Sequence, residues 1–192
     1  MKELVIASDN KGKIREITAL LDDVQLLSLK DIGFTDVIAE PYHTFEENAL
    51  AKASAIYEFC GKNVFADDSG LCVSALGDEP GVDSAHYSGT RDDVKNLNKV
   101  LAELEGETDR TAYYKAVICL IWNGETYFFE GVCDGAITQA PEGNDGFGYD
   151  PIFKPNGFEE TFGHIPLNIK NTISHRGKAI AKMVAFLQQQ DV

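Results

Sequence analysis

The amino-acid sequence predicts an α/β protein built on a mixed β-sheet flanked by helices. Strand-like and helix-like segments alternate in the N-terminal half, as in sheets whose parallel strands are joined by helices. Asn123-Gly124 separates two strand-like runs, which is a strong signal for an antiparallel hairpin with a type I′ turn. The chain has 192 residues, of which 44% are hydrophobic, so it can bury one full core. A single domain over residues 1–192 is therefore expected.

The N-terminal elements follow from short apolar runs and their spacing. An apolar run predicts a strand over residues 3–8, and a second run predicts a strand over residues 24–29. Between them, apolar residues recur at helical spacing at Ile14, Ile17, Leu20 and Leu21. Thr44, with Glu47 three residues later, forms a capping box and predicts the start of the next helix. One face of that helix carries Phe45, Ala49, Lys52, Ala53, Ile56 and Cys60.

The middle of the chain predicts a strand over residues 63–67 and gives a candidate strand over residues 71–76. Residues 77–91 are rich in Gly, Asp and Ser and are expected to form a loop. Thr90 is expected to cap a helix. The apolar face of this helix would be Val94, Leu97, Leu101 and Leu104.

The C-terminal third predicts a long strand over residues 111–122, apolar on both faces and therefore central in the sheet. Its hairpin partner is expected at residues 125–133, followed by a Gly-rich loop over residues 139–150. A last helix is predicted from about residue 175. Its buried face would be Ala179, Ile180, Met183, Val184 and Leu187.

Charge and cysteine content exclude several classes of function. The 17 basic and 31 acidic residues give a net charge of −14, which argues against a grip on DNA or RNA. No run approaches the roughly 20 apolar residues of a membrane span, and the N-terminus shows no signal peptide, so a cytoplasmic protein is expected. The four cysteines form no C-x-x-C pair and are expected to be reduced, buried thiols.

Five polar segments are better explained by binding than by packing, at residues 8–13, 40–48, 66–70, 143–151 and 170–176. The first of them leaves a strand and enters a helix, whose N-terminus offers free N–H groups to a phosphate. Lys11 and Lys13 add positive charge, and Gly12 allows close approach of the backbone. The alternative is a plain turn with two exposed lysines.

Asp67 and Asp68 follow an apolar strand and should point to different sides of it, so that one can reach a cleft while the other braces a loop. Carboxylate oxygens suit Mg²⁺, which takes one or two carboxylates together with substrate phosphates. The alternative is a solvated Asp-Ser-Gly turn.

Two further motifs could recognise a nucleobase. The loop Gly146-Phe147-Gly148-Tyr149-Asp150 offers aromatic rings for stacking, although ordinary packing explains such rings equally well. At the head of the last helix, Lys170, His175 and Arg176 gather cationic donors that suit an anion or a base-edge acceptor. A solvated helix start is the alternative there.

Taken together, these motifs resemble the inosine/xanthosine triphosphate pyrophosphatase family, whose members hydrolyse deaminated purine nucleoside triphosphates. The matching stretches occur in family order over nearly the whole chain: Ala7–Lys13, Thr44–Ala53, Phe65–Leu71, Pro80-Gly81, Gly146–Phe153, Lys170 and Ser174–Arg176. The resemblance implies an elongated mixed sheet with two lobes, a central substrate cleft and a homodimer. The implied reaction converts ITP, dITP or XTP to the monophosphate and pyrophosphate with Mg²⁺, keeping these nucleotides out of DNA and RNA.

The resemblance also implies a role for each motif. Glu40 and Asp68 would bind the metal, and Asp68 would accept a proton from the attacking water. The triphosphate would be held by Ser8, Asp9, Asn10, Lys11, Gly12 and Lys13. The other substrate-binding residues would be Ser69, Phe147, Gly148, Tyr149, Asp150, Lys170, His175 and Arg176. Phe147 would stack on the base. Hypoxanthine and xanthine carry an oxygen at the 6-position that Arg or His can satisfy, whereas adenine carries an amine there.

The sequence departs from the family pattern in places that bear on substrate range and rate. Asp9 adds a negative charge near the phosphate turn unless it caps the helix. Asp83 and His86 lie in a stretch that usually carries an Arg, and Asn144-Asp145 and Gly163–Pro166 also differ. Three other functions compete with this one: a pyrophosphatase for pyrimidine or modified nucleotides, a nucleotide sensor without turnover, and a nucleic-acid-binding module. The presence of Glu40 and Asp68 argues against the sensor, and the net charge of −14 argues against the nucleic-acid-binding module.

Overall fold

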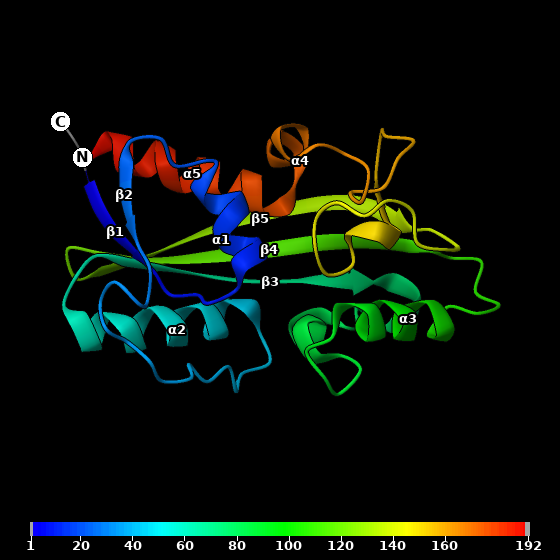
Figure 1. Cartoon of the computed structure of the whole chain (residues 1–192), viewed down its shortest axis with the longest axis horizontal. Helices are drawn as coiled ribbons and strands as arrows, with labels where there is room; N and C mark the ends of the chain where they lie inside the picture. The colour runs from blue at the N-terminus through cyan, green and yellow to red at the C-terminus, as the bar shows by residue number, and fades with distance from the viewer. Residues whose placement is uncertain (1, 191–192) are drawn as a thin grey trace. The chain divides into compact units, whose positions relative to one another are not determined.

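The fold is a six-stranded mixed sheet flanked by helices, and the computed structural model describes residues 2–190 (Figure 1). The strand order is β2-β1-β3-β4-β5-β6. These strands are β1 (Lys2–Ile6), β2 (Val24–Leu27), β3 (Val64–Val73), β4 (Thr111–Trp122), β5 (Glu125–Ile137) and β6 (Phe153–Pro155). β1 pairs in parallel with β2 and β3, whereas β5 and β6 are antiparallel. The predicted α/β class with a mixed sheet is therefore confirmed.

The chain divides into two compact units, each made of separate segments. The first unit contains the residues up to Asp68, Ala116–Gly131 and the residues from Arg176 onward. The second unit contains Ser69–Lys115 and Val132–His175. The predicted cleft and the assignment of residues 1–192 to one domain stay predictions.

The first unit places helices on both faces of its part of the sheet. α1 (Lys11–Thr18) and α5 (His175–Gln189) lie on one face, and α2 (Phe45–Cys60) lies on the other (Figure 1). The core beneath α1 and α5 includes Leu4, Ile6, Ile17, Phe65, Ile118, Ile180 and Met183. Four of the five residues predicted for the buried face of the last helix are fully packed, and Val184 is partly buried.

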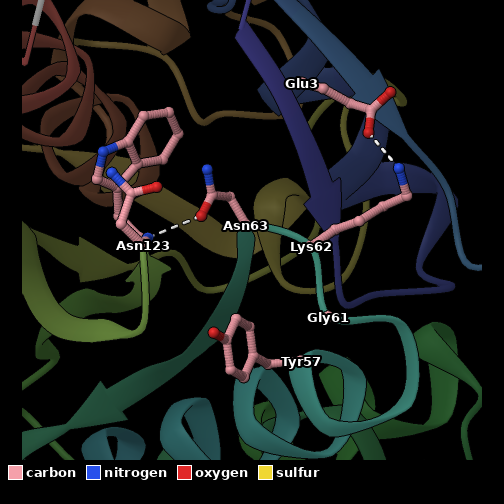
Figure 2. Close-up of a pocket in the computed structure, with 7 residues that line it drawn as sticks. Glu3, Tyr57, Gly61, Lys62, Asn63 and Asn123 are labelled. Atoms are coloured by element: carbon pink, nitrogen blue, oxygen red, sulfur yellow. Dashed lines mark hydrogen bonds and ion pairs between the residues drawn. The ribbon is translucent and has the colours of Figure 1, made fainter.

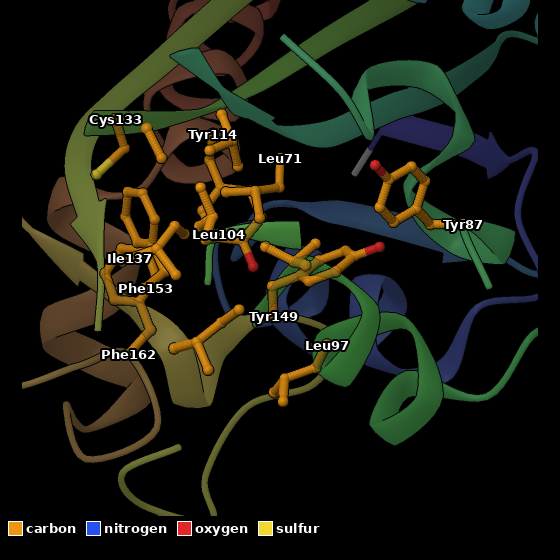
Figure 3. Packing of buried hydrophobic residues seen from close by; sticks show 14 of the residues in the cluster. Leu71, Tyr87, Leu97, Leu104, Tyr114, Cys133, Ile137, Tyr149, Phe153 and Phe162 are labelled. Carbon is orange, nitrogen blue, oxygen red and sulfur yellow. The ribbon is translucent and has the colours of Figure 1, made fainter. Parts of the chain in front are cut away.

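The second unit has its own core, which is rich in aromatic side chains (Figure 3). Tyr114 of β4 packs edge-on against Phe153, with ring centroids 4.6 Å apart, and Phe162 lies against both rings. The remaining regular elements are α3 (Asp93–Glu103), α4 (Leu167–Ile173) and the short helices η1 (Ser74–Leu76), η2 (Gly81–His86) and η3 (Asp150–Ile152). This core supports the loop and helix ends that carry the predicted base-binding residues.

Several predicted elements are confirmed closely. α2 has the expected start, because the Thr44 side chain accepts a hydrogen bond from Glu47 N at 3.2 Å. β4 covers the predicted residues, and the turn residues Asn123 and Gly124 both have the positive φ that a type I′ turn requires. All four cysteines are free thiols, as expected, and Cys72, Cys119 and Cys133 are buried. The predicted burial is wrong for Cys60, which is only partly buried at the last position of α2. No helix among residues 2–190 is long and apolar enough to cross a membrane.

Other predicted boundaries are wrong. β3 runs without a break through residues 66–70, where a loop was expected, because Asp67 finds buried cationic partners and strand pairing can continue. The candidate strand at residues 71–76 is the end of β3 followed by η1, and η2 interrupts the predicted loop at 77–91. β5 extends to Ile137, four residues beyond the prediction, and residues 170–176 are the end of α4 and the start of α5 rather than a loop.

The cap of α3 also differs from the prediction. Asp92 rather than Thr90 caps the helix, by accepting a hydrogen bond from Lys95 N at 3.0 Å. Val94 lies in the first turn of α3 and is 66% exposed, so its predicted burial is wrong, whereas Leu97 and Leu104 are buried as predicted. A carboxylate one position before the first helical residue is a strong N-cap, and it overrides the Thr signal two residues earlier.

Candidate active site

A cluster of charged side chains surrounds Asp67 and Asp68 of β3 in the first unit. Successive side chains of a strand point to opposite faces, so the two acids meet different partners. Asp67 Oδ1 lies 2.6 Å from Lys13 Nζ, and Asp67 Oδ2 lies 3.1 Å from Arg176 Nε. Asp68 Oδ1 instead lies 2.9 Å from Lys52 Nζ. The alternation expected from the sequence is therefore confirmed.

Asp67 is the centre of a buried ionic network. It is 1% exposed, and although burial opposes its charge, Arg176 and Lys13 hold the pKa of Asp67 far below its usual value of 3.8. Arg176 also pairs with Glu16 of α1, which is fully buried. Burial disfavours the guanidinium charge, but Asp67 and Glu16 raise the pKa of Arg176 above its usual value. The network ties α1 and α5 to β3, and sequence reasoning missed Glu16.

The predicted phosphate turn forms the N-terminus of α1. Asn10 caps this helix, because its side chain accepts a hydrogen bond from Lys13 N at 3.0 Å. Ser8 Oγ accepts a hydrogen bond from Asn10 N at 3.2 Å, whereas Asp9 and Lys11 are exposed. Asn10 and not Asp9 is therefore the cap, so the extra charge of Asp9 remains in solvent beside the turn.

Lys52 of α2 belongs to this charged cluster. The sequence predicted its place on the inner face of the helix but not its contacts with the acids. Its ammonium contacts Glu40 Oε1, donates to Asp67 O at 2.8 Å and pairs with Asp68 Oδ1. Burial alone would lower the pKa of Lys52, but the negative charges of Asp68 and Glu40 raise it by more. The net shift of the Lys52 pKa is therefore upward. A lysine on the buried face of an otherwise apolar helix stripe was the signal in the sequence that could have identified it.

Asp68 is nearly buried and has spare capacity to accept bonds. Burial raises the pKa of Asp68 to about 6, against the opposing effect of Lys52, and the nearby charge of Glu40 adds to the rise. Oδ2 of Asp68 has no hydrogen-bond partner among the described residues. A buried carboxylate oxygen in this state can accept a proton or bind a cation.

The second unit holds a cluster of polar contacts around Asp150. Asp150 Oδ2 accepts hydrogen bonds from Phe147 N at 2.9 Å and Lys170 Nζ at 2.6 Å, and both charged side chains are 3% exposed. Tyr114 OH lies 3.4 Å from Asp150 Oδ1. Lys170 Nζ also lies 5.4 Å from the centroid of the Phe147 ring. The structure thus brings together three predicted base-binding residues, Phe147, Asp150 and Lys170.

The loop that presents Phe147 is fixed at several points. Gly146 and Gly148 flank it with positive φ, and a Cβ at Gly146 would lie 2.0 Å from Asp150 Oδ2. Gly148 N donates to Asp93 at the start of α3 at 2.9 Å. Tyr149 is buried, and its hydroxyl donates to Ser84 O at 2.6 Å. The loop conformation therefore depends on the two glycines and on the carboxylates of Asp93 and Asp150, which accept hydrogen bonds from the loop backbone.

His175 lies buried against Tyr114, with ring centroids 4.5 Å apart and planes 7° from parallel. Stacking on a rigid strand residue fixes the imidazole plane. Sequence reasoning missed Tyr114, because it lies in a strand that reads as apolar.

The remaining predicted residue, Ser69, lies on β3, and the family departures Asp83 and His86 lie on η2. Ser69 is partly buried on β3, and the next residue, Gly70, has no space for a Cβ beside Gly81 O. Asp83 and His86 are exposed and lie 3.5 Å apart on η2. The departure from the family at these positions therefore falls on a surface pair of the second unit.

A shallow hollow of about 400 Å³ in the first unit has no part in these clusters (Figure 2). It is lined by Glu3, Tyr57, Gly61, Lys62, Asn63, Trp122 and Asn123. Lys62 is paired with Glu3 at 2.5 Å, and Asn63 accepts a hydrogen bond from Asn123 N. None of the predicted site residues lines it.

The oxygen donors of the first unit fit Mg²⁺. Mg²⁺ is bound through one or two carboxylates while retaining water and substrate phosphate ligands. Glu40 and Asp68 form such a pair and already share one cationic group, the Lys52 ammonium. No cluster of three or more His, Cys, Asp or Glu side chains suited to a metal occurs within residues 2–190.

Fold and site together define an α/β protein in which lysines and carboxylates gather beside the N-terminus of a helix. Comparison with known proteins specifies the class further. The Ham1 family model matches residues 4–186, and the chain belongs to this family.

Several curated relatives of similar length share one name, dITP/XTP pyrophosphatase. The dITP/XTP pyrophosphatase of Flavobacterium johnsoniae is 46% identical over 187 residues, covering 96% of this chain and 97% of the relative. The dITP/XTP pyrophosphatase of Bacillus licheniformis is 46% identical over 195 residues, covering 98% and 100% of the two chains.

Solved structures confirm the fold. The Ham1 protein of Staphylococcus aureus superposes with a TM-score of 0.89 at 39% identity, covering 98% of this chain and 100% of the other. A HAM1 protein from Coxiella burnetii gives a TM-score of 0.90 at 36% identity with the same coverage.

Proposed function

We propose that this chain is a nucleoside triphosphate pyrophosphatase that hydrolyses ITP, dITP and XTP to the nucleoside monophosphate and pyrophosphate. The names of its Ham1-family relatives support the substrate class. The observation that carries the chemistry is the Glu40–Asp68 carboxylate pair, where Asp68 Oδ2 is buried and has no hydrogen-bond partner among the described residues. Removing these nucleotides keeps deaminated purines out of DNA and RNA.

Glu40 and Asp68 would hold Mg²⁺ through their carboxylate oxygens. When bound, Mg²⁺ would offset phosphate charge and polarise the phosphoryl group as a Lewis acid. Asp68 would also orient the attacking water and accept its proton on the carboxylate. The water oxygen forms a bond to the α-phosphorus, and the bond from the α-phosphorus to the α,β-bridging oxygen breaks. Pyrophosphate leaves with that bonding electron pair.

Cationic donors of the first unit would balance the charge of the triphosphate. Lys13 and the N-terminus of α1 supply a side-chain ammonium and backbone N–H groups, with Ser8, Asp9, Asn10, Lys11 and Gly12 forming the turn. Lys52 supplies a second buried ammonium. Such preorganised charges stabilise the leaving pyrophosphate more in the transition state than in the substrate.

The second unit would hold the nucleoside. Phe147 stacks on the purine, and Gly148, Tyr149 and Asp150 line the base and sugar on a loop that is already fixed. Lys170 is held by Asp150, so its direction is set before substrate binds. Through family resemblance, His175 of this unit and Arg176 of the first unit are assigned to the purine edge, and Ser69 to the substrate. A donor that faces the 6-oxygen of hypoxanthine or xanthine would be opposed by the amine of adenine.

The assembly and location follow from the same family assignment. We propose a homodimer of single-domain chains in the cytoplasm, with Mg²⁺ as the cofactor. The net charge of −14 is unfavourable for polymeric nucleic acid and supports a free nucleotide as the ligand.

Isotope placement tests the proposed attack at the α-phosphorus. Hydrolysis of ITP in ¹⁸O-labelled water should give labelled IMP and unlabelled pyrophosphate. Label in pyrophosphate, or release of orthophosphate and IDP as first products, would overturn the proposed reaction.

A further inference from the structure

Glu40 lies on a segment with no regular secondary structure and few buried side chains. No helix or strand occurs between Leu27 and Phe45. Most side chains of this segment are exposed, including Val37 at 92% and Tyr42 at 47%. A segment with so little burial is expected to fluctuate unless polar contacts fix its backbone. The carboxylate of Glu40 must nevertheless reach the site defined by Lys52 and Asp68.

The contact that fixes the backbone of this segment beside Glu40 comes from Asn48, a buried residue of α2. Asn48 Oδ1 accepts a hydrogen bond from Tyr42 N, and Asn48 Nδ2 donates to Tyr42 O, both at 3.0 Å. The side-chain amide therefore clamps both backbone groups of a residue two positions after Glu40. Asn48 is 2% exposed, so the paired hydrogen bonds are shielded from water.

Asn48 and Lys52 hold different parts of the segment that carries Glu40. They lie four residues apart on α2, a spacing that places both on one helix face. Lys52 contacts the carboxylate of Glu40, and Asn48 holds the backbone that follows it. Loss of Lys52 would remove charge from the site, whereas loss of Asn48 would leave the charges intact and release only the segment.

The second unit repeats this device and supplies a matched control. Asn96 of α3 also lies four residues after its N-cap and is 2% exposed. Its Oδ1 accepts from Ser88 N at 2.8 Å, and its Nδ2 donates to Ala85 O at 3.2 Å. Asn96 therefore also holds two backbone groups with its side-chain amide, at Ala85 of η2 and at Ser88, but this segment carries no predicted metal ligand.

We propose that Asn48 is a positioning residue that holds Glu40 beside Asp68 and thereby sets the affinity of this carboxylate pair for a divalent cation. The inference rests on the proposed role of Glu40 and Asp68 in binding Mg²⁺. Partners that orient a metal ligand from behind usually change metal affinity by about 10- to 100-fold when they are removed.

The test measures binding of Mn²⁺ alone to the nucleotide-free protein, by electron paramagnetic resonance of the free ion. Asn48→Ala should weaken Mn²⁺ binding by about tenfold. Asn96→Ala, which removes an equivalent clamp, should leave it unchanged. In turnover assays Asn48→Ala should raise the Mg²⁺ concentration for half-maximal rate, with kcat at saturating Mg²⁺ close to that of the wild type. A merely structural loss would lower kcat at every Mg²⁺ concentration.

Two further variants separate failure of the inference from failure of the proposed metal site. If Glu40→Gln abolishes Mn²⁺ binding while a folded Asn48→Ala variant binds normally, the positioning role is overturned and the metal site stands. If Mn²⁺ binding survives Glu40→Gln, the metal site is wrong and the role of Asn48 is overturned with it. Should Asn48→Ala not fold, Asn48→Ser gives the same comparison, because its short hydroxyl cannot replace both amide contacts.

Discussion

At the scale of single residues, Asp67 and Asp68 show how surroundings assign different chemistry to identical neighbours. Asp67 has Lys13 and Arg176 as ionic partners, so its charge is permanent and its contribution is to hold α1 and α5 on β3. Asp68 has Lys52 on one oxygen and no hydrogen-bond partner among the described residues on the other. We therefore expect their replacement to have different consequences.

Asp68→Asn should abolish turnover and preserve the fold. The amide keeps the size of the side chain but cannot accept the proton of the attacking water, and general bases contribute about 10²- to 10⁴-fold to rate. We expect kcat for ITP to fall by roughly 1000-fold. Steady-state kinetics gives the rate, and a thermal melt checks the fold. A rate like that of the wild type would remove Asp68 from the mechanism.

Lys13→Ala should act mainly on substrate binding. A hydrogen bond to a charged group contributes about 1.5–3 kcal/mol, so KM for ITP is expected to rise by at least about tenfold. Lys11→Ala is the matched control, because Lys11 is an exposed lysine in the same turn and should change KM by much less. The assignment of this turn to the triphosphate fails if Lys13→Ala leaves both KM and kcat unchanged.

At the scale of elements, β3 carries both the acid pair and Gly70, a glycine whose side-chain position is blocked by neighbouring atoms. A Cβ at Gly70 would lie 2.1 Å from Gly81 O and 2.5 Å from Ser84 Oγ. Because one of these neighbours is backbone, the structure must shift to relieve the overlap. The close approach also lets Ser84 Oγ accept a hydrogen bond from Leu71 N at 2.9 Å.

Gly70→Ala is therefore expected to destabilise the protein by about 1–3 kcal/mol, the usual cost of overpacking. For a chain of this size the melting temperature should fall by several degrees, at about 2–4 °C per kcal/mol. Differential scanning calorimetry measures the change. An unchanged melting temperature would show that the contact between β3 and η2 yields without cost.

Local sequence signals predicted the elements whose boundaries depend on local chemistry. The Thr44 capping box and the Asn123-Gly124 turn gave the starts of α2 and β5, because a cap or a tight turn is decided by a few adjacent residues. The continuity of β3 could not be predicted this way. It depends on Lys13 and Arg176, which are distant in sequence and make a buried Asp67 acceptable within a strand.

The residues of the candidate site also divide into those that local sequence signals predict and those that only contacts distant in sequence reveal. Motifs identified the acids, the lysine turn and the aromatic loop, because those residues are clustered in sequence. Lys52, Glu16 and Tyr114 were missed, since each lies within a helix or strand whose pattern is otherwise explained by packing. Only tertiary contacts show that Lys52 pairs with Glu40 and Asp68, that Glu16 pairs with Arg176 and that Tyr114 stacks on His175.

At the scale of the whole molecule, the distribution of charge is more informative than its sum. The chain carries 31 acidic and 17 basic residues, yet Lys52, Lys170 and Arg176 are buried beside carboxylates. An acidic exterior repels nucleic acid polymers, whereas buried cations can still bind a small anion that reaches them. This arrangement favours a free nucleotide over a nucleic acid as the ligand.

The most direct test of this account is pyrophosphate release with Mg²⁺ at alkaline pH, comparing ITP, XTP, GTP, ATP and dTTP at equal concentration. We predict that ITP and XTP are turned over at least about 100-fold faster than the other three, because a site that pairs with base-edge groups discriminates strongly. Equal or pyrimidine-biased turnover would contradict the assignment of the base pocket. Binding of ITP without any release of pyrophosphate by the folded protein would contradict the enzymatic function and favour a nucleotide sensor.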